Sequence, residues 1–379
     1  MQDFEARLPD MLALLKRLVE CESPSRDKAA VDQVGALVAE ECRRLGAQVE
    51  IHPQTTAGDH VEACFRPSNV GKEITRETAI LLLCHMDTVF PLSTSTRMPC
   101  YEKDGKLYGP GAQDMKGGIV VALATLTALA ESAQMPNRPI TALFTSDEET
   151  GSRTSRALIE KLAKESALVL VLEPAMPDGA LKTWRKGVGD FVVKVRGRAA
   201  HAGADHEQGR NAIQELAYQV LAIQKLTDYA RGTTLNVGTI RGGTAANVVP
   251  DEAMVELDMR VLRPGEAERV SARLNSLKPI LEGTSIEITG ELNRPPMPFD
   301  DHMKATFAKA KLIAANAGIE LKAGGTGGAS DANFVAPLGI PVLDGLGPVG
   351  EGEHSEREHI FVASLTERAR LLATLLREW

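Results

Sequence analysis

The chain has 379 residues and a formal net charge of -8, with 43% hydrophobic and 25% charged residues. This length usually exceeds what one hydrophobic core supports, so two domains are expected, and the composition excludes extensive disorder. The excess of acidic groups also excludes broad nucleic-acid binding, because few spare cations exist to displace counterions from phosphates. We therefore expect a small-molecule or short-peptide substrate.

The N-terminal sequence, MQDFEARLPDMLALLKRL, has early acids and apolar residues at helical intervals, unlike a secretory signal peptide. No apolar stretch approaches the length of a membrane span, so no membrane partner is expected. The five cysteines are odd in number and lack CxxC spacing, as is typical of reduced thiols. These features together predict a cytoplasmic protein.

Helical and strand-like patterns alternate in the first half of the chain. Continuous apolar runs, such as TAILLLC and ALVLVLE, are typical of strands buried on both faces. The alternation predicts an α/β arrangement of layers. The expected helices are 5–20, 28–46, 117–133 and 155–163, and the expected strands are 78–84, 140–146 and 167–173.

The pattern changes at about residue 188 to the order βαββαβ, which is that of a ferredoxin-like unit. A Pro-rich segment, NRPPMPF, closes this unit, and helices and strands then resume up to a helix at 363–378. We therefore expect an α+β domain at 187–292 inserted into an α/β domain made of 1–186 and 293–379. The expected strands of the insert are 190–197, 233–240, 252–262 and 285–290, and its helices are 211–226 and 265–281.

His85 and Asp87 follow the first expected buried strand, within the motif HMDT. Positions i and i+2 of an extended segment share a face, so the Asp87 carboxylate can orient the His85 imidazole. Taken alone, the pair fits a hydrogen-bonded structural histidine better than a metal ligand.

Further carboxylates and a second histidine occupy comparable places. Asp114 lies in the Gly-rich segment GPGAQDMKGG, where it either caps the following helix or binds a ligand. The acids of DEET at 147–150 repel one another unless water or a divalent cation separates them. Glu173 ends a buried run and needs a partner, whereas His354 in GEHSE would by itself be an ordinary loop histidine.

Two histidines and three carboxylates at such places form a mixed nitrogen and oxygen ligand set, which suits two zinc ions sharing a bridging carboxylate. The absence of thiolates argues against a closed structural zinc site. The expected ligands are His85, Asp114, Glu149, Glu173 and His354.

Seven motifs occur in this order along the chain: HMDTV, GPGAQDMKGG, SDEETGS, LEP, AHAG, GGTAANVVP and GEHSE. Through these motifs the chain resembles the M20 metallopeptidases over nearly its whole length, and most of all the glutamate carboxypeptidases of the carboxypeptidase G2 type. This resemblance implies a zinc-peptidase-like catalytic domain, with a central mixed sheet flanked by helices, and an inserted dimerisation or lid domain. The clan also contains N-acyl-amino-acid deacylases and tripeptide aminopeptidases.

The resemblance assigns roles to the expected ligands. It implies two Zn²⁺ per chain, with Co²⁺ or Mn²⁺ as alternatives, and Asp114 as the bridge between them. His85 and Glu173 would complete one position, and Glu149 and His354 the other. The family also tends to hold a cis peptide just after the bridging aspartate, here between Asp114 and Met115.

Catalytic roles follow from the same resemblance. Glu148 would be the general base, taking a proton from the attacking water and passing it to the leaving nitrogen. Asp87 would orient His85. In a homodimer, His201 would reach the partner's site and stabilise the oxyanion. The alternative for His201 is an ordinary surface histidine.

Substrate contacts are expected from the inserted domain and from both parts of the catalytic domain. An arginine can bind a terminal carboxylate through two parallel hydrogen bonds, although Arg260 also fits a strand surface. A glutamate side chain would need a second cation, and the segment TWRKG departs from the family pattern there. The expected contacts are Arg260, Asn247, Arg294, Gly328 and Lys182, with Arg185 as the alternative to Lys182.

The leading hypothesis is a di-zinc hydrolase that releases a C-terminal amino acid, glutamate above all, from peptides, folate-like compounds or N-acyl-amino acids. One alternative is a deacylase or aminopeptidase of the same family. Another, from a different class, is an inactive homologue that only binds a ligand.

Overall fold

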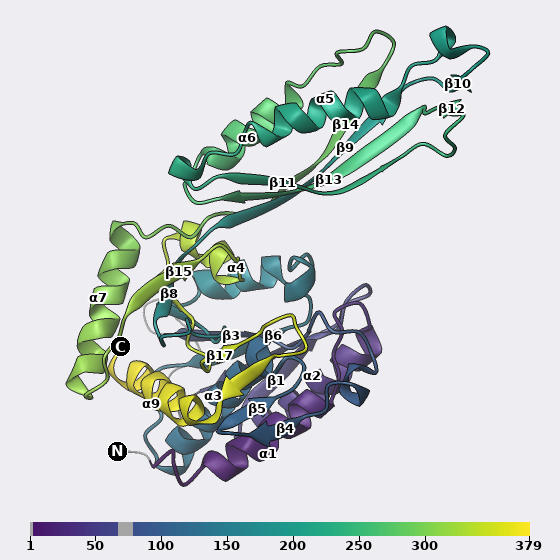
Figure 1. Cartoon of the computed structure of the whole chain (residues 1–379). Coiled ribbons are helices and arrows are strands. Elements are labelled where there is room, and N and C mark those ends of the chain that lie inside the picture. Colours follow the sequence, from purple (N-terminus) through teal and green to yellow (C-terminus); the bar gives the residue numbers. More distant parts are fainter. Residues whose placement is uncertain (1–2, 67–78) are drawn as a thin grey trace. The chain divides into compact units, whose positions relative to one another are not determined.

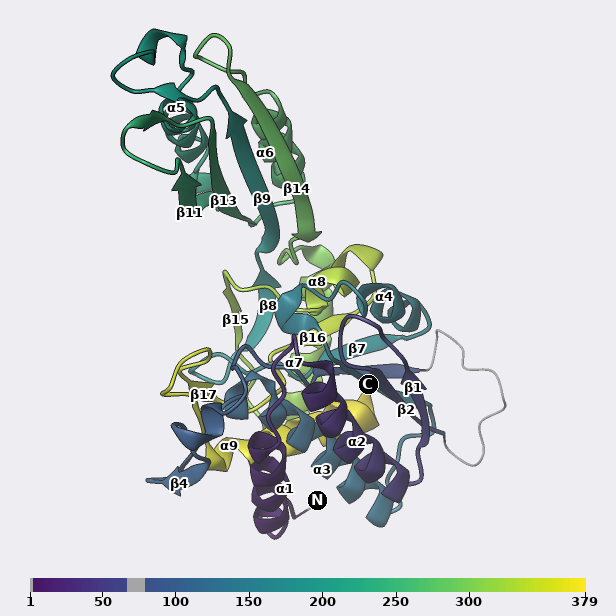
Figure 2. The ribbon, with the colours of Figure 1, turned by 90° about the vertical axis from the view of Figure 1, so that its right-hand side faces the viewer.

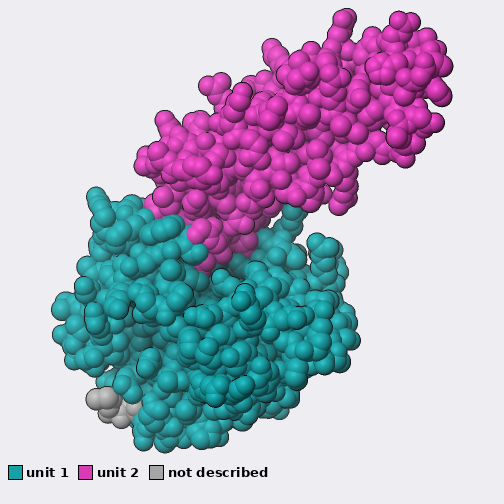
Figure 3. All heavy atoms as spheres, in the orientation of Figure 1, with its two compact units in different colours: residues 1–184, 299–326, 330–379 teal, residues 185–298, 327–329 magenta. Residues whose placement is uncertain are grey.

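The computed structural model describes residues 3–66 and 79–379, so Thr78, where the first expected buried strand begins, lies outside the described residues. The chain divides into two compact units (Figure 3). Unit 1 comprises Met1–Trp184, Phe299–Thr326 and Ser330–Trp379, and unit 2 comprises Arg185–Pro298 and Gly327–Ala329. Within the described ranges, no helix is both long and apolar enough to span a membrane.

An eight-stranded mixed sheet forms the centre of unit 1 (Figure 1). Its four inner strands, β6, β3, β7 and β16, are parallel, whereas β1 and β2 form an antiparallel edge and β8 runs antiparallel to β16. All residues of β3, β6 and β7 are buried, as the apolar runs predicted. The strand order is β1 (Gln48–His52), β2 (His60–Phe65), β6 (Ile140–Thr145), β3 (Ile80–His85), β7 (Leu168–Val171), β16 (Val342–Asp344), β8 (Leu181–Arg185) and β15 (Ala323–Thr326).

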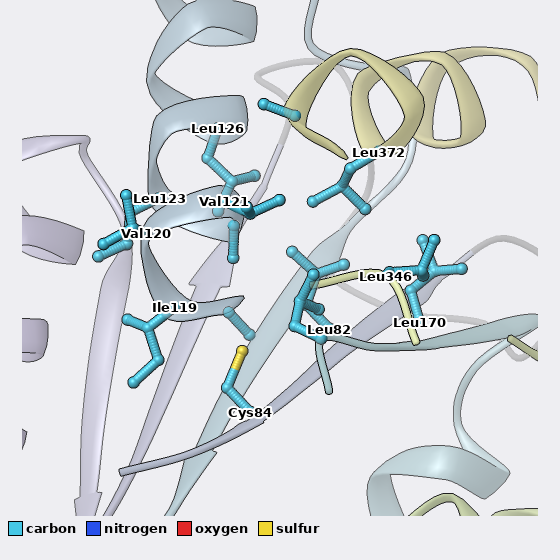
Figure 4. Packing of buried hydrophobic residues seen from close by; sticks show 14 of the residues in the cluster. Leu82, Cys84, Ile119, Val120, Val121, Leu123, Leu126, Leu170, Leu346 and Leu372 are labelled. Carbon is cyan, nitrogen blue, oxygen red and sulfur yellow. The ribbon is translucent and has the colours of Figure 1, made fainter. Parts of the chain in front are cut away.

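The largest hydrophobic core lies between one face of this sheet and five helices. Alternate residues of β3 point into it, and Cys84 lies near Ile119 of α3, while Leu82 lies toward Leu170 and Leu346 (Figure 4). Helix α3 is apolar on all sides because α1 and α9 also pack against it. The five helices are α1 (Leu8–Glu20), α2 (Lys28–Arg44), α3 (Gly117–Glu131), α7 (Asp301–Asn316) and α9 (Val362–Glu378).

Shorter elements complete unit 1. Helix α4 (Arg156–Lys164) lies on the other side of the large sheet and contacts α8 (Ala332–Val335) (Figure 2). A four-stranded antiparallel sheet has the order β17 (Gly350–Glu351), β18 (His359–Phe361), β5 (Lys106–Tyr108) and β4 (Tyr101–Lys103). Helical turns lie at Thr94–Thr96, Ala112–Lys116, Glu148–Thr150 and Ala336–Leu338.

Unit 2 is a ferredoxin-like α+β fold, as predicted. Its four antiparallel strands have the order β11, β13, β9 and β14, and α5 and α6 cover one face of the sheet (Figures 1 and 2). A short pair, β10 (Ala200–His201) with β12 (Val248–Val249), stands outside this sheet. The main elements are β9 (Gly187–Arg196), α5 (Ala212–Gln224), β11 (Thr234–Gly242), β13 (Glu252–Val261), α6 (Glu266–Asn275) and β14 (Ser285–Arg294), with turns at His206–Gln208 and Tyr229–Arg231.

One expected element differs clearly from the structure. The helix predicted at 265–281 ends at Asn275, because Pro279 lacks an N–H and disfavours helical geometry just before it. The buried Glu215 carboxylate then accepts the backbone N–H groups of Ile280 and Leu281, which holds this segment in a loop. The other expected elements occur, with ends shifted by a few residues.

Candidate metal centre

His85 is the last residue of β3 and is 2% exposed. Its Nε2 lies 3.0 Å from Oδ1 of Asp114 and 3.5 Å from Oε1 of Glu173. Its Nδ1 lies 3.0 Å from the main-chain oxygen of Asp87, which is closer than the 3.5 Å to the Asp87 carboxylate. A carbonyl oxygen only accepts hydrogen bonds, so Nδ1 carries a proton and Nε2 is the nitrogen directed at the carboxylates.

Asp114 stands in the turn between β5 and α3. Its peptide bond to Met115 is cis, as the resemblance implied, and its Oδ2 lies 3.3 Å from Nε2 of His354. Asp114 does not cap α3, because the helix begins at Gly117 with no side-chain cap. The capping interpretation is therefore wrong, and both Asp114 oxygens face histidines instead.

A glycine brings the start of α3 close to Glu173. A Cβ at Gly118 would lie 2.0 Å from the main-chain oxygen of Leu172, so only glycine fits against this backbone. Glu173 itself is buried two residues beyond β7, where it meets His85. The Gly-rich segment thus serves the packing around the cluster as well as the turn.

The turn at Glu148–Thr150 follows β6. Oε2 of Glu149 lies 3.3 Å from Nε2 of His354, while the other oxygen, Oε1, is buried and has no hydrogen-bond partner among the described residues. The Asp87 carboxylate accepts the backbone N–H groups of Glu148 and Glu149 at 3.1 and 3.2 Å. Asp87 therefore connects this turn to the end of β3.

The electrostatics of the cluster favour a bound cation. Burial works against a charged His85, yet hydrogen bonds to its carboxylate neighbours hold its pKa well above the ordinary value. The Asp114 and Glu149 carboxylates raise the pKa of His354 to about 11, and burial raises the pKa of Glu149 to about 7. Bound protons thus offset the negative charge of the crowded carboxylates here, and a divalent cation can take the place of these protons.

The donor set fits such a cation. Ligand atoms of His85, Asp114 and Glu149 all lie within 4.8 Å of one another, and the unpartnered Oε1 of Glu149 is a buried acceptor that needs a positive partner. Imidazole and carboxylate donors without thiolate suit a zinc-like ion in a catalytic rather than a structural site.

The other expected site residues lie mostly in unit 2. His201 is exposed, and its Nδ1 accepts the N–H groups of Gly203 and Ala204 at 3.1 and 3.0 Å, which places its proton on Nε2. The Arg260 guanidinium pairs with the Asp258 carboxylate through Nε and Nη2.

Three more expected substrate contacts belong to unit 2, as does Arg185, the alternative to Lys182, whereas Lys182 itself belongs to unit 1. The main-chain oxygen of Asn247 accepts the N–H of Ala202, and Arg294 is buried near the end of β14. Arg185 donates to the carbonyls of Gly328 and Ala329 and thus holds this loop. Lys182 is buried in β8 of unit 1, opposite Asp344 of β16.

Sequence reasoning missed Glu358. This residue is 0% exposed, and its Oε1 accepts the backbone N–H groups of Gln113 and Asp114. Its surroundings in the sequence, EREH, read as a solvated charged loop. Only its spacing of four residues after His354 could have drawn attention to it.

Histidines and carboxylates gathered at the ends of parallel strands in an α/β domain form a candidate metal centre of the kind that metal-dependent hydrolases contain. Residues 81–378 match the family described as Peptidase family M20/M25/M40, and the chain therefore belongs to this family of hydrolases.

Relatives and solved structures agree with this family. The chain is 30% identical to carboxypeptidase G2 of Pseudomonas sp. (strain RS-16), over 98% of this chain and 89% of that protein. It is 28% identical to succinyl-diaminopimelate desuccinylase of Xanthomonas euvesicatoria pv. vesicatoria (strain 85-10), over 78% and 82% of the two chains. The fold is similar to that of aminopeptidase PepT from Bacillus cereus ATCC 10987, with a TM-score of 0.79 and 24% identity over 98% of each chain.

Proposed function

We propose that the protein is a di-zinc carboxypeptidase that hydrolyses an amide bond and releases a C-terminal amino acid, with glutamate as the expected residue. The observation that carries the chemistry is the turn after β6. Oε2 of Glu149 lies 3.3 Å from Nε2 of His354 there, and the half-buried Glu148 directly precedes Glu149 in the same turn.

In this proposal the cluster would hold two neighbouring cations. Asp114 lies between the histidines, so it would bridge the two ions, with His85 and Glu173 on one side and Glu149 and His354 on the other. When bound, the ions polarise the scissile carbonyl and lower the pKa of the attacking water. Zinc is the expected metal, with cobalt or manganese as alternatives.

The remaining steps belong to side chains of the protein. Glu148 would take the proton of the attacking water and deliver it to the leaving nitrogen, which turns a poor leaving group into an amine. The Nε2 proton of His201 suits a donor to the oxyanion of the tetrahedral intermediate. We propose that a second copy of the chain supplies this histidine, in a homodimer formed through unit 2.

The choice of a carboxypeptidase rests on the similarity to carboxypeptidase G2 and on the arginines of unit 2. Arg260 would hold the terminal carboxylate, with support from Asn247 and Arg294. Gly328 and Lys182 are the further proposed substrate contacts. We also propose a cytoplasmic location, in line with five cysteines that are all free in the structure.

A second candidate is an N-acyl-amino-acid deacylase. The similarity to succinyl-diaminopimelate desuccinylase favours it, because such an enzyme needs the same metal cluster and differs in the acyl pocket. An aminopeptidase is the third candidate, and it would instead require a free amine on the substrate.

A substrate panel tests the proposal directly. Release of glutamate would be measured from N-acyl-glutamates and dipeptides, with the acyl group and the C-terminal residue varied in turn, before and after complete removal of metal. Activity that survives metal removal would contradict the metal-dependent mechanism. A strict need for a free amine would identify an aminopeptidase, and tolerance of any C-terminal residue would favour a deacylase.

A further inference from the structure

Glu358 connects two segments that are 244 residues apart in the sequence. It lies just before β18, four residues after His354, and is fully buried. Its Oε1 accepts the N–H of Gln113 at 2.9 Å and the N–H of Asp114 at 3.1 Å. Its own main-chain oxygen accepts the N–H of Gly109 at 3.2 Å, so it contacts the Asp114 turn through side chain and main chain.

The Glu358 carboxylate supplies hydrogen-bond acceptors that the backbone around Asp114 lacks. Residues Asp114 and Met115 have non-helical backbone angles, so the regular ladder of carbonyl acceptors is interrupted at this turn. Backbone N–H groups in a buried turn still need acceptors, and a carboxylate oxygen accepts two of them strongly. Glu358 therefore determines where the backbone of Asp114 lies.

The same residue constrains the other side of the cluster. Glu358 is in the segment that carries His354, whose Nε2 faces Oδ2 of Asp114 at 3.3 Å. Anchoring the Asp114 turn to this segment therefore fixes two expected metal ligands relative to each other. Glu356, two residues earlier, provides a contrast, because its side chain is 70% exposed and lies 3.7 Å from Arg97.

We propose that Glu358 is a positioning residue, which holds Asp114 and His354 at the separation that cation binding requires. This role rests on the proposed function, in which these two residues are metal ligands. It needs an acceptor oxygen at this position and does not need a negative charge, because the groups it holds are backbone N–H donors.

The test compares three variants of the full chain: Glu358→Ala, Glu358→Gln and the control Glu356→Ala. Zinc affinity of the metal-free chains would be measured by competition with a chromophoric chelator, and amide exchange would be followed at Gln113 and Asp114. Loss of Glu358 is expected to weaken zinc binding by about 10- to 100-fold, as is typical when a group that orients metal ligands is removed. Both amides should also exchange faster.

The glutamine variant separates positioning from charge and from folding. Its side-chain oxygen can still accept both N–H groups, so its zinc affinity should stay within about fivefold of wild type, as should that of Glu356→Ala. A glutamine variant that binds zinc more than about fivefold more weakly than wild type would overturn the proposal, and this comparison needs no folded Glu358→Ala. Zinc affinity that is unchanged in Glu358→Ala would overturn it too.

These results are distinct from failure of the proposed function. A wild-type chain that binds no zinc would overturn the metal mechanism and the positioning role together. A wild-type chain that binds two zinc ions, together with an alanine variant that binds them equally well, would overturn only the role of Glu358.

Discussion

The buried Asp87 carboxylate accepts the backbone N–H of Glu148 at 3.1 Å through Oδ1. Its Oδ2 accepts the next N–H, that of Glu149, and its main-chain oxygen lies 3.0 Å from Nδ1 of His85. One residue thus connects the histidine at the end of β3 with both consecutive glutamates, one expected to bind metal and one expected to move protons.

Replacing Asp87 by asparagine should therefore impair the site without emptying it. In the wild type, each oxygen of the Asp87 carboxylate accepts one backbone N–H group. In the asparagine variant an amide nitrogen, which is a donor, would replace one of these oxygens and face an N–H donor, so the turn would shift. We expect kcat/KM to fall by about 10- to 100-fold. Asp301→Asn is the control, because that carboxylate is 99% exposed, and equal activity of the two variants would refute the connection.

Glu148 and Glu149 should respond differently to the same change. Glu148→Gln should lower kcat by about 10²- to 10⁴-fold with normal metal content, since it removes only the general base. Glu149→Gln should lower metal content, because the residue contacts His354 directly. Elemental analysis and steady-state kinetics on both variants check this, and an active Glu148→Gln enzyme would exclude the assigned base.

Removal of metal should abolish activity and lower the unfolding temperature, because bound ions stabilise only the folded chain. Zinc, cobalt or manganese should restore activity to the dialysed protein. Magnesium should restore little, since it prefers an all-oxygen shell and the cluster includes His85 and His354. Full recovery with magnesium would contradict the mixed ligand set.

Arg260→Lys should raise KM for substrates with a free C-terminal carboxylate by about tenfold or more, with a smaller effect on kcat. A lysine cannot present two parallel donors, and it would also lose the geometry that Asp258 imposes on the guanidinium. Arg241→Lys, at an exposed position of β11, is the matched control. An unchanged KM would mean that Arg260 does not hold the carboxylate.

The stability of unit 2 should depend on pH through Glu266. Its buried carboxylate accepts hydrogen bonds from Arg269, Arg231 and Thr233. These hydrogen bonds lower the pKa of Glu266 to about 2, and the one from Arg269 has the largest effect. A depressed pKa means that the stabilisation is present above the ordinary pKa of 4.5 and is lost as the pH falls toward about 2.

Glu266→Gln should therefore destabilise unit 2 by about 1 to 2 kcal/mol at pH 7, a modest effect because both arginines are partly exposed. The difference in the free energy of unfolding between this variant and the wild type should shrink as the pH falls below about 4.5. Hydrogen exchange of the α6 amides across this range measures it. A difference that stays constant with pH would show that the ionised carboxylate is not the source.

Much of this protein was determined by short-range features of the sequence. The runs TAILLLC and ALVLVLE indicated buried strands, and the order of elements between β9 and β14 indicated the ferredoxin-like unit. Histidines and carboxylates at strand ends and in a loop that opens a helix were expected to form one cluster, and of these His85, Asp114 and Glu149 lie close together.

Only the tertiary structure decided which groups hold the cluster in place. The sequence around Asp87 does not reveal that its carboxylate accepts hydrogen bonds from two backbone N–H groups of the turn after β6. The sequence around Glu358 likewise does not reveal that this residue is buried and accepts a hydrogen bond from the backbone N–H of Asp114. The loop after α6 is likewise held by the distant Glu215, which accepts the N–H of Leu281. Hydrogen bonds between distant segments leave no periodic pattern, because they depend on where folding places one backbone beside another. Apolar periodicity, by contrast, is local and can be recognised before the chain folds.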